Sequence, residues 1–281
     1  GIAYQDCSGL GVIDNLSLLD NAGTYGALLV KNSGDFVIGS NNTITGNSWP
    51  LSIDCGSFPD ENSAIPAAGN TNNDIQVVSG TGDKTGFWPR FDGLEYVVTG
   101  SPELVDTLTI AAGNTLRFRN GASLKIYGAL HAPGTQDSAI IFTRDDTTHQ
   151  WSGLRFYSGS SGDLDYCTVE YATYGTGYGI RASTPASLTL DHCVLQDNDY
   201  GFYGSGGSPV FAYNNEIINN TTYGIYLING CIPVLGDTLP EWNDVYGNGT
   251  YDLYNNQGDS VYAGYVYWGT TNEDSIRAHI Y

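Results

Sequence analysis

The feature that most constrains this chain is a repeat within its own sequence. The motif Leu164-Asp-Tyr-Cys-Thr-Val169 returns as Leu190-Asp-His-Cys-Val-Leu195 and, more loosely, as Ala212-Tyr-Asn-Asn-Glu-Ile217. Each copy is a short apolar run interrupted by two or three polar residues. Repeats of this kind are typical of a solenoid, in which each unit buries its apolar side against its neighbours.

A tyrosine-glycine pair follows each copy of the motif and sets the period. The glycines of the pairs, Gly179, Gly201 and Gly224, lie 22 and 23 residues apart, and Tyr246-Gly247 follows after another 23. The apolar runs are too short for helices but long enough for strands of three to five residues. Three such strands with their turns fill one coil of a parallel β-helix.

Alternation within the motif predicts a corner. Leu164 and Val169 are five residues apart, so strict alternation cannot bury both. A corner at Asp165 and Tyr166 turns Leu164, Cys167 and Val169 inward and leaves Asp165 outside, and the copy at Leu190–Leu195 behaves in the same way. The predicted fold is therefore all-β: a right-handed parallel β-helix of about a dozen rungs, with a period of 22–26 residues. We expect one domain over residues 1–281, cut from a longer chain, with a loop excursion at 55–73, where strand-length apolar runs are missing.

Composition supports this fold and disfavours several partners. The chain has 37 glycines, no methionine and only 14% charged residues, so long helices have little to form from. The net charge of −20, with ten Lys and Arg residues, argues against nucleic acid and anionic membranes as partners. No run of 18 apolar residues occurs, so we expect no membrane insertion.

The cysteines and histidines do not form a recognisable metal or redox motif. We expect Cys167 and Cys193 to be small inward groups on neighbouring rungs, where a disulfide is geometrically conceivable but not required. No Cys-x-x-Cys pair is present, and the four histidines are scattered. His192 occupies the corner position of Tyr166 and Asn214, which favours a role in the turn. Paired asparagines such as Asn214-Asn215 and Asn219-Asn220 suit turns, with the inward members forming hydrogen-bonded ladders.

Several segments resemble secreted bacterial right-handed parallel β-helix repeat proteins of the pectate-lyase-like superfamily. Residues 108–135 resemble their opening coil, Trp151-Ser-Gly-Leu-Arg-Phe156 their middle rungs, and residues 267–276 their closing segment. The resemblance implies an extracellular or cell-surface protein. It says little about activity, because these proteins include lyases, hydrolases, adhesins and passenger domains.

The resemblance leaves an enzyme as the alternative function. Pectate-lyase-like members use a carboxylate cluster for calcium and a basic residue as the base, and related hydrolases use Asp residues with a Gly-His-Gly motif, which this chain lacks. Asp165 and Asp191 face outward on neighbouring coils, a spacing that suits the two carboxylates of a glycosidase. The simpler interpretation is two solvated charges at a corner. Arg155 and Arg181 also stack on the outer face, but two arginines are weak support for a groove that binds the carboxylates of a polyuronate.

Calcium is a second use of the acidic residues. Asp197 and Asp199, with Asn198 between them, and Asp163, with Asp165, place oxygen ligands on turns, as hard cations prefer. Neither an EF-hand loop nor a Gly-Gly-x-Gly-x-Asp repeat is present. We therefore expect that the protein requires no cofactor, and calcium binding remains an alternative.

The tyrosines give the leading functional hypothesis. Alternation after the tyrosine-glycine pairs turns Tyr203, Tyr226 and Tyr254 outward, with Arg181 at the matching position one coil earlier. Such a strip could stack the apolar faces of sugar rings, or the rings could simply cover the sheet. We expect a non-catalytic extracellular or cell-surface module, an adhesin or spacer, that binds a polysaccharide or cell-surface glycan and is joined to further domains of its chain. The alternatives are a polysaccharide lyase or glycoside hydrolase, and self-association through exposed rung edges.

Overall fold

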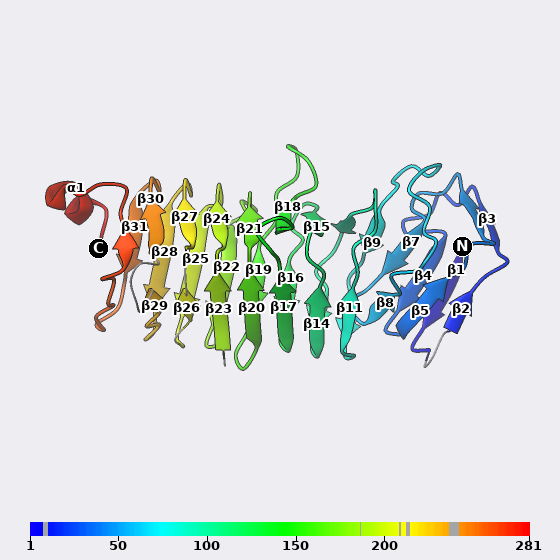
Figure 1. The fold of residues 1–281 in the computed structure, drawn as a ribbon, viewed down its shortest axis with the longest axis horizontal. Coiled ribbons are helices and arrows are strands. Elements are labelled where there is room, and N and C mark those ends of the chain that lie inside the picture. Colours follow the sequence, from blue (N-terminus) through cyan, green and yellow to red (C-terminus); the bar gives the residue numbers. More distant parts are fainter. Residues whose placement is uncertain (8–10, 186, 208, 212–213, 236–241) are drawn as a thin grey trace.

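The chain winds into a solenoid of parallel strands, a parallel β-helix, with its two ends at opposite ends of the long axis (Figure 1). The computed structural model describes residues 1–7, 11–185, 187–207, 209–211, 214–235 and 242–281. Ala212 and Tyr213 of the third motif copy therefore lie outside the described residues. The longest sheet, here called the long sheet, receives one strand from each coil. Its strands are β1 Ile2–Gln5, β4 Leu28–Lys31, β7 Leu51–Ile53, β9 Ile75–Val77, β12 Tyr96–Val98, β15 Thr115–Phe118, β18 Ile140–Arg144, β21 Cys167–Glu170, β24 Val194–Gln196, β27 Glu216–Ile218, β30 Asn243–Tyr246 and β32 Val266–Tyr267.

Two further sheets complete the coils after residue 80. The eight-stranded sheet contains β10 Thr81–Gly82, β13 Glu103–Leu104, β16 Leu124–Ile126, β19 Leu154–Phe156, β22 Tyr178–Ser183, β25 Tyr200–Ser205, β28 Tyr223–Ile228 and β31 Tyr251–Asn255. The seven-stranded sheet contains β11 Gly86–Trp88, β14 Thr107–Ile110, β17 Ala129–Pro133, β20 Ser161–Asp165, β23 Ser187–Asp191, β26 Val210–Phe211 and β29 Val234–Leu235. All the strand pairs between coils are parallel, as predicted for an all-β parallel solenoid.

The two ends differ from the middle. The first coils form a three-stranded sheet and a two-stranded sheet, made of β2 Gly11–Ile13, β5 Gly34–Ile38 and β8 Ser57–Pro59, and of β3 Ser17–Leu19 and β6 Thr43–Thr45. At the other end lies α1, Glu273–Ala278, whose N-cap Asn272 accepts a hydrogen bond from the backbone N–H of Ser275. No helix in the described residues is long and apolar enough to cross a membrane.

The corner predicted within the motif is present. Leu164, Cys167 and Val169 are buried, as are Leu190, Cys193 and Leu195, whereas Asp165 and Asp191 are partly exposed. Between β20 and β21 Tyr166 takes a left-handed backbone with φ of 45°, and His192 and Asn214 repeat it at 50° and 47°. A left-handed residue between two strands turns the chain sharply, and this allows both Leu164 and Cys167 to point into the core.

Residues 55–73 differ from the predicted excursion. Ser57–Pro59 form β8, all three residues are buried, and this strand pairs with β5. The strand-free part begins at Asp60, yet the backbone N–H groups of Thr71 and Asn72 still bond to Asn47 and Ser48 of the preceding coil. The segment therefore follows the solenoid path. Phe58 is the one large apolar residue of this strand, and small residues fill the buried positions beside it. The sequence therefore showed no apolar run long enough to predict a strand.

An asparagine ladder runs inside the coils, as the paired asparagines predicted. Asn198 Nδ2 donates to Asn220 Oδ1 at 3.1 Å, and Asn220 Nδ2 donates to Asn248 Oδ1 at 2.9 Å. The ladder ends at Asp252, whose Oδ1 accepts from Asn248 Nδ2 at 2.8 Å. All four side chains are buried. A second, shorter ladder joins Asn215 to Asn243 at 2.8 Å.

The ladder explains the glycine of the tyrosine-glycine pairs. A Cβ atom on Gly179, Gly201 or Gly224 would lie 2.6–2.7 Å from the amide nitrogen of a ladder asparagine. Only glycine leaves room for the ladder there. The fourth in-register pair is Tyr251-Asp252, because β28 pairs Tyr223 with Tyr251. Tyr246-Gly247, which the period suggested, is wrong as the fourth marker, since Tyr246 lies in β30 of the long sheet.

The last member of the ladder, Asp252, is ionisable, and its charge affects the stability of the fold. Burial raises the pKa of Asp252, and this outweighs the opposing hydrogen bonds from Asn248 and the nearby His279. A carboxyl group with a raised folded pKa destabilises the fold as pH rises through its unfolded value of 3.8 toward the folded one. We therefore expect Asp252→Asn to be more stable than the wild type at pH 7.5, by about 0.5–2 kcal/mol, because the amide oxygen still accepts from Asn248.

Urea unfolding of both proteins at pH 7.5 and near pH 4 measures this difference. The gain should shrink at the lower pH, because the carboxyl of the wild type takes up protons as the pH falls toward 3.8. Asp259→Asn, at an exposed position, is the matched control and should change little. A variant less stable than the wild type at pH 7.5 would show that the ladder requires the charge of Asp252.

Four of the five cysteines, all except Cys7, are buried packing groups. Cys167 and Cys193 are buried on neighbouring rungs as free thiols, each with its Sγ within 3.4 Å of a backbone carbonyl oxygen. Burial raises the pKa of Cys55 and of Cys231 to about 12, so neither is a ready thiolate. Their burial agrees with the inward position predicted for the repeat cysteines.

Candidate functional site

Two rows of tyrosines lie side by side on the outside of the eight-stranded sheet, and we call them together the tyrosine face. The first row is the predicted one: β22, β25, β28 and β31 pair Arg181 with Tyr203, Tyr203 with Tyr226, and Tyr226 with Tyr254. The second row was not predicted, because three of its members were interpreted only as markers of the period and Tyr246 was taken in place of the fourth. It consists of Tyr178, Tyr200, Tyr223 and Tyr251.

The rings of the first row stack on one another. Tyr203 and Tyr226 have ring centroids 5.5 Å apart at an interplanar angle of 5°, and Tyr226 and Tyr254 are 5.1 Å apart at 10°. Tyr281, near the carboxyl end of the chain, extends the stack at 4.5 Å from Tyr254. At the other end the guanidinium of Arg181 lies 5.6 Å from the Tyr203 ring centroid. Because each ring covers the face of its neighbour, the row presents ring edges and hydroxyl groups to solvent.

The second row has a different geometry. The Tyr200 ring stands edge-on to both Tyr178 and Tyr223, at interplanar angles of 86° and 89°. The two rows also contact each other, with Tyr200 and Tyr226 centroids 5.5 Å apart. Burial among these rings raises the pKa of Tyr200 to about 12, so its hydroxyl stays protonated and able to donate. The tyrosine face is thus a rigid aromatic surface rimmed by phenolic hydroxyls.

Basic residues continue the first row toward the amino-terminal end of the sheet. The strand register places Lys125 beside Arg155 and Arg155 beside Arg181. Lys125 Nζ is 2.9 Å from Glu103 Oε1, whereas the buried Nε of Arg155 has no hydrogen-bond partner among the described residues. Three of the chain's ten Lys and Arg residues therefore share one row with the tyrosines.

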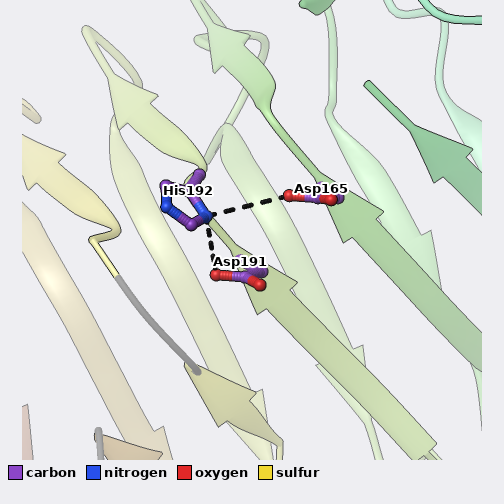
Figure 2. Close-up of side chains that lie close together, drawn as sticks. All are labelled: Asp165, Asp191 and His192. Atoms are coloured by element: carbon purple, nitrogen blue, oxygen red, sulfur yellow. Dashed lines mark ion pairs between the residues drawn. The ribbon is translucent and has the colours of Figure 1, made fainter. Parts of the chain in front are cut away.

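The second candidate site is the corner between the seven-stranded sheet and the long sheet, which Figure 2 shows. Asp165 and Asp191 end the paired strands β20 and β23, and His192 follows at the turn. His192 Nδ1 lies 2.9 Å from Asp191 Oδ1 and 3.9 Å from Asp165 Oδ1. We call these three residues the corner cluster. Burial, together with the negative charge of Asp191, raises the pKa of Asp165.

The structure thus brings Asp165 and Asp191 together as the sequence predicted, with His192 beside them. The three potential ligand atoms of the cluster lie within 4.8 Å of one another, so these carboxylate oxygens are no farther apart than the carboxyl groups of a retaining glycosidase. Three hollows of about 470, 360 and 230 Å³ are lined by other residues. Asp165 and Asp191 are partly exposed at the corner of the coil.

The first of the two predicted calcium sets, Asp197 to Asp199, does not converge on one point. Asn198 belongs to the asparagine ladder, so its side chain points inward, away from Asp197 and Asp199. Asp199 Oδ2 accepts from the backbone N–H of Gly177 at 3.0 Å, and Asp163 is exposed on β20. Within the described ranges, the corner cluster is the one group of three His, Cys, Asp or Glu residues close enough to share an ion.

An arginine cluster on the long sheet escaped prediction. Arg117 pairs with Asp74 and Glu95 at 2.5 Å each, and with Asp145. Burial opposes the charge of Arg117, but the three carboxylates raise its pKa above the ordinary value. Asp74, Glu95 and Arg90 also line the 360 Å³ hollow. The signal was available, since Glu95 and Asp145 lie about one coil before and after Arg117 in the sequence, but coils of unequal length obscured it.

Comparison with protein families agrees with this architecture. Residues 111–272 match a family model described as the right handed beta helix region. The chain belongs to this right-handed β-helix family. Comparison with curated proteins and with solved structures gives no match. The match covers more than half of this β-helix chain and confirms the predicted hand of the coil. The matched residues include the coils that carry the tyrosine face and the corner cluster.

Proposed function

We propose that this β-helix is a non-catalytic carbohydrate-binding module of a secreted or cell-surface protein. The observation that carries the proposal is the tyrosine face, two in-register rows of partly exposed tyrosines on one rigid sheet. Aromatic side chains with a polar tip suit ligands that are apolar on one side and hydroxylated on another, as sugars are. The parallel coils repeat the same side chains at a spacing of about 4.8 Å, which suits an extended polymer.

The ring geometry favours hydrogen bonding over ring stacking in the first row. Its ring faces are covered by neighbouring rings, so a glycan would contact edges and hydroxyls. Among the described residues, Tyr226 is the one member of the tyrosine face whose hydroxyl has a side-chain partner, Asn256 Nδ2 at 3.2 Å. The other hydroxyls are available to a ligand. Stacked rings lose little side-chain freedom on binding, and such pre-organisation favours affinity.

The basic row points to glycans that carry acidic groups. Arg155 and Arg181 lie one coil apart and continue directly into Tyr203. In a chain with a net charge of −20, a local row of cations is the one part of this surface suited to carboxylate or sulfate groups. The proposal therefore places the acidic groups of the glycan over the arginines and its neutral hydroxyls over the tyrosines.

A glycan array followed by titration calorimetry tests the proposal. We expect Tyr203→Ala/Tyr226→Ala to weaken binding roughly 10- to 100-fold, since each lost hydroxyl hydrogen bond costs about 1 kcal/mol. Tyr203→Phe/Tyr226→Phe keeps the rings and should lose most of the same affinity if the hydroxyls make the contacts. Arg155→Ala/Arg181→Ala should weaken acidic glycans more than neutral ones. Tyr262→Ala, an exposed tyrosine outside the tyrosine face, is the matched control.

Two outcomes would contradict the proposal. Binding that is unchanged in the double tyrosine variant would place the contact elsewhere, and the absence of any bound glycan would leave a structural spacer. The array is therefore run with and without calcium, and bound glycans are assayed for reducing ends and for unsaturated products.

An enzyme is the second candidate, favoured by the corner cluster. Asp165 and Asp191 are adjacent carboxylates, and burial raises the pKa of Asp165, as a general acid requires. Product formation that is lost in Asp165→Asn and Asp191→Asn would replace the binding proposal by a glycoside hydrolase or lyase. The 360 Å³ hollow suits an enzyme less well, because its two carboxylates, Asp74 and Glu95, are already ion-paired with Arg117.

A further inference from the structure

We propose that the corner cluster, Asp165, Asp191 and His192, binds a divalent transition-metal ion such as Zn²⁺. The three side chains converge on one point, as Figure 2 shows. Asp165 Oδ1, Asp191 Oδ1 and His192 Nδ1 are each shielded from solvent and lack a hydrogen-bond partner in the described part of the chain. This site is separate from the tyrosine face, which lies on a different sheet, so the inference goes beyond the proposed function.

Unpaired buried polar atoms are costly, and here three of them share one space. A proton on His192 Nδ1 is not well placed to bond to either carboxylate. Asp165 Oδ1 is 3.9 Å away, and the 2.9 Å ion-pair contact with Asp191 Oδ1 lacks hydrogen-bond geometry. A cation between the three atoms gives each of them a partner at once. It also neutralises two adjacent carboxylates in a chain of net charge −20.

The distances suit a small ion. Ligand atoms about 2.0–2.1 Å from a tetrahedral zinc ion lie roughly 3.3 Å from one another. The separations from His192 Nδ1, 2.9 Å and 3.9 Å, bracket this value, so small side-chain rotations would reach it. The side chains of the cluster remain 30–43% exposed, which leaves an access path and a coordination position for water.

The donor atoms select the class of ion. One imidazole nitrogen with two carboxylate oxygens suits zinc and its neighbours, whereas calcium takes six to eight oxygen ligands. The site therefore differs in its chemistry from the calcium sites considered above, although it shares Asp165 with the pair Asp163 and Asp165.

The surroundings orient the imidazole. Tyr166 stacks on the His192 ring with centroids 4.4 Å apart at 12°, and the left-handed corner sets the direction of the side chain. The Asn214 amide lies 3.1 Å from His192 Nε2. The facing amide atom is Nδ2, so with a metal on Nδ1 and the proton on Nε2 the Asn214 amide turns over and its oxygen accepts from Nε2, as the outer partner that metal-bound histidines usually have.

The test is a calorimetric titration of tag-free, chelator-treated protein with Zn²⁺ at pH 7.5, with Ca²⁺ titrated in parallel. We expect one zinc ion per chain, an affinity lower by roughly 100-fold or more in His192→Asn, and a clear loss in Asp165→Asn. His192→Asn preserves the turn, because Asn214 adopts the same left-handed conformation at the equivalent corner. His149→Ala is the control, since His149 pairs with Asp146 alone and should not affect binding.

Circular dichroism of each variant confirms that the coil is intact. The proposal is overturned if the wild type binds no zinc, if His192→Asn binds as tightly as the wild type, or if calcium binds at the cluster as tightly as zinc. Because Asp165→Asn leaves the corner backbone unchanged, it tests the site even if His192→Asn does not fold.

Discussion

Replacing Asn220 by alanine is expected to lower the free energy of unfolding by about 3–5 kcal/mol. Asn220 is the middle of the asparagine ladder and is 1% exposed. Its Oδ1 accepts from the backbone N–H and the side chain of Asn198, both at 3.1 Å. Its Nδ2 donates to the carbonyl of Leu195 at 3.0 Å and to Asn248 Oδ1 at 2.9 Å. Alanine removes all four bonds and leaves buried partners unpaired, which costs more than the bonds contribute.

Urea unfolding followed by circular dichroism measures this loss. The matched control is Asn219→Gly, one residue earlier: Asn219 is exposed and left-handed with φ of 55°, a conformation that glycine adopts without strain. The control should change stability by less than about 1 kcal/mol. A change of similar size in both variants would mean that the ladder adds nothing beyond the turn.

The same substitution connects the core to the tyrosine face. The ladder passes beside Gly201 and Gly224, which immediately follow Tyr200 and Tyr223. The contact between the ladder and these glycines fixes where β25 and β28 begin. A coil without its ladder asparagine loses that contact. We therefore infer that the buried asparagines hold the two tyrosine rows in register.

Alternation and period were enough to predict much of this architecture. The corner at Tyr166 follows from the five-residue gap between Leu164 and Val169, and the structure confirms it. The row from Arg181 to Tyr254 also lies in register as predicted, because each strand keeps the same offset from its tyrosine. These features depend on local geometry that repeats from coil to coil. Carbohydrate binding by this row stays a prediction.

The remaining features depend on contacts between coils of unequal length. Tyr223 pairs with Tyr251, 28 residues later, whereas Tyr178 and Tyr200 are 22 apart, so a fixed period selected Tyr246 instead. The covered ring faces of the first row could not be predicted either, since they follow from rotamers set by neighbouring rungs. The approach of His192 to both carboxylates could not be predicted either. The direction of a side chain at a corner is set by the local backbone conformation, which the spacing of residues in the sequence does not reveal.

The second large effect is expected from Trp151→Ala, which should destabilise the protein by about 3–5 kcal/mol. Trp151 is fully buried, stacks on Phe118 with centroids 4.1 Å apart, and donates from Nε1 to the Glu170 carbonyl at 2.8 Å. Alanine would leave a large cavity between two coils and an unpaired carbonyl. Trp242→Ala makes the same chemical change at a 45% exposed position, and we expect it to stay within about 0.5 kcal/mol of the wild type.

Hydrogen exchange read by mass spectrometry locates the damage. A coil of a solenoid contacts only its neighbours, so Trp151→Ala should lower amide protection in β15, β18, β19 and β21 more than in β28 and β31. The glycan binding proposed for Tyr226 and Tyr254, which lie on those distant strands, should then survive at temperatures where the damaged coils have opened. Uniform loss of protection along the whole chain would instead show that the coils unfold as one cooperative unit, and the tyrosine face would fail together with the core around Trp151.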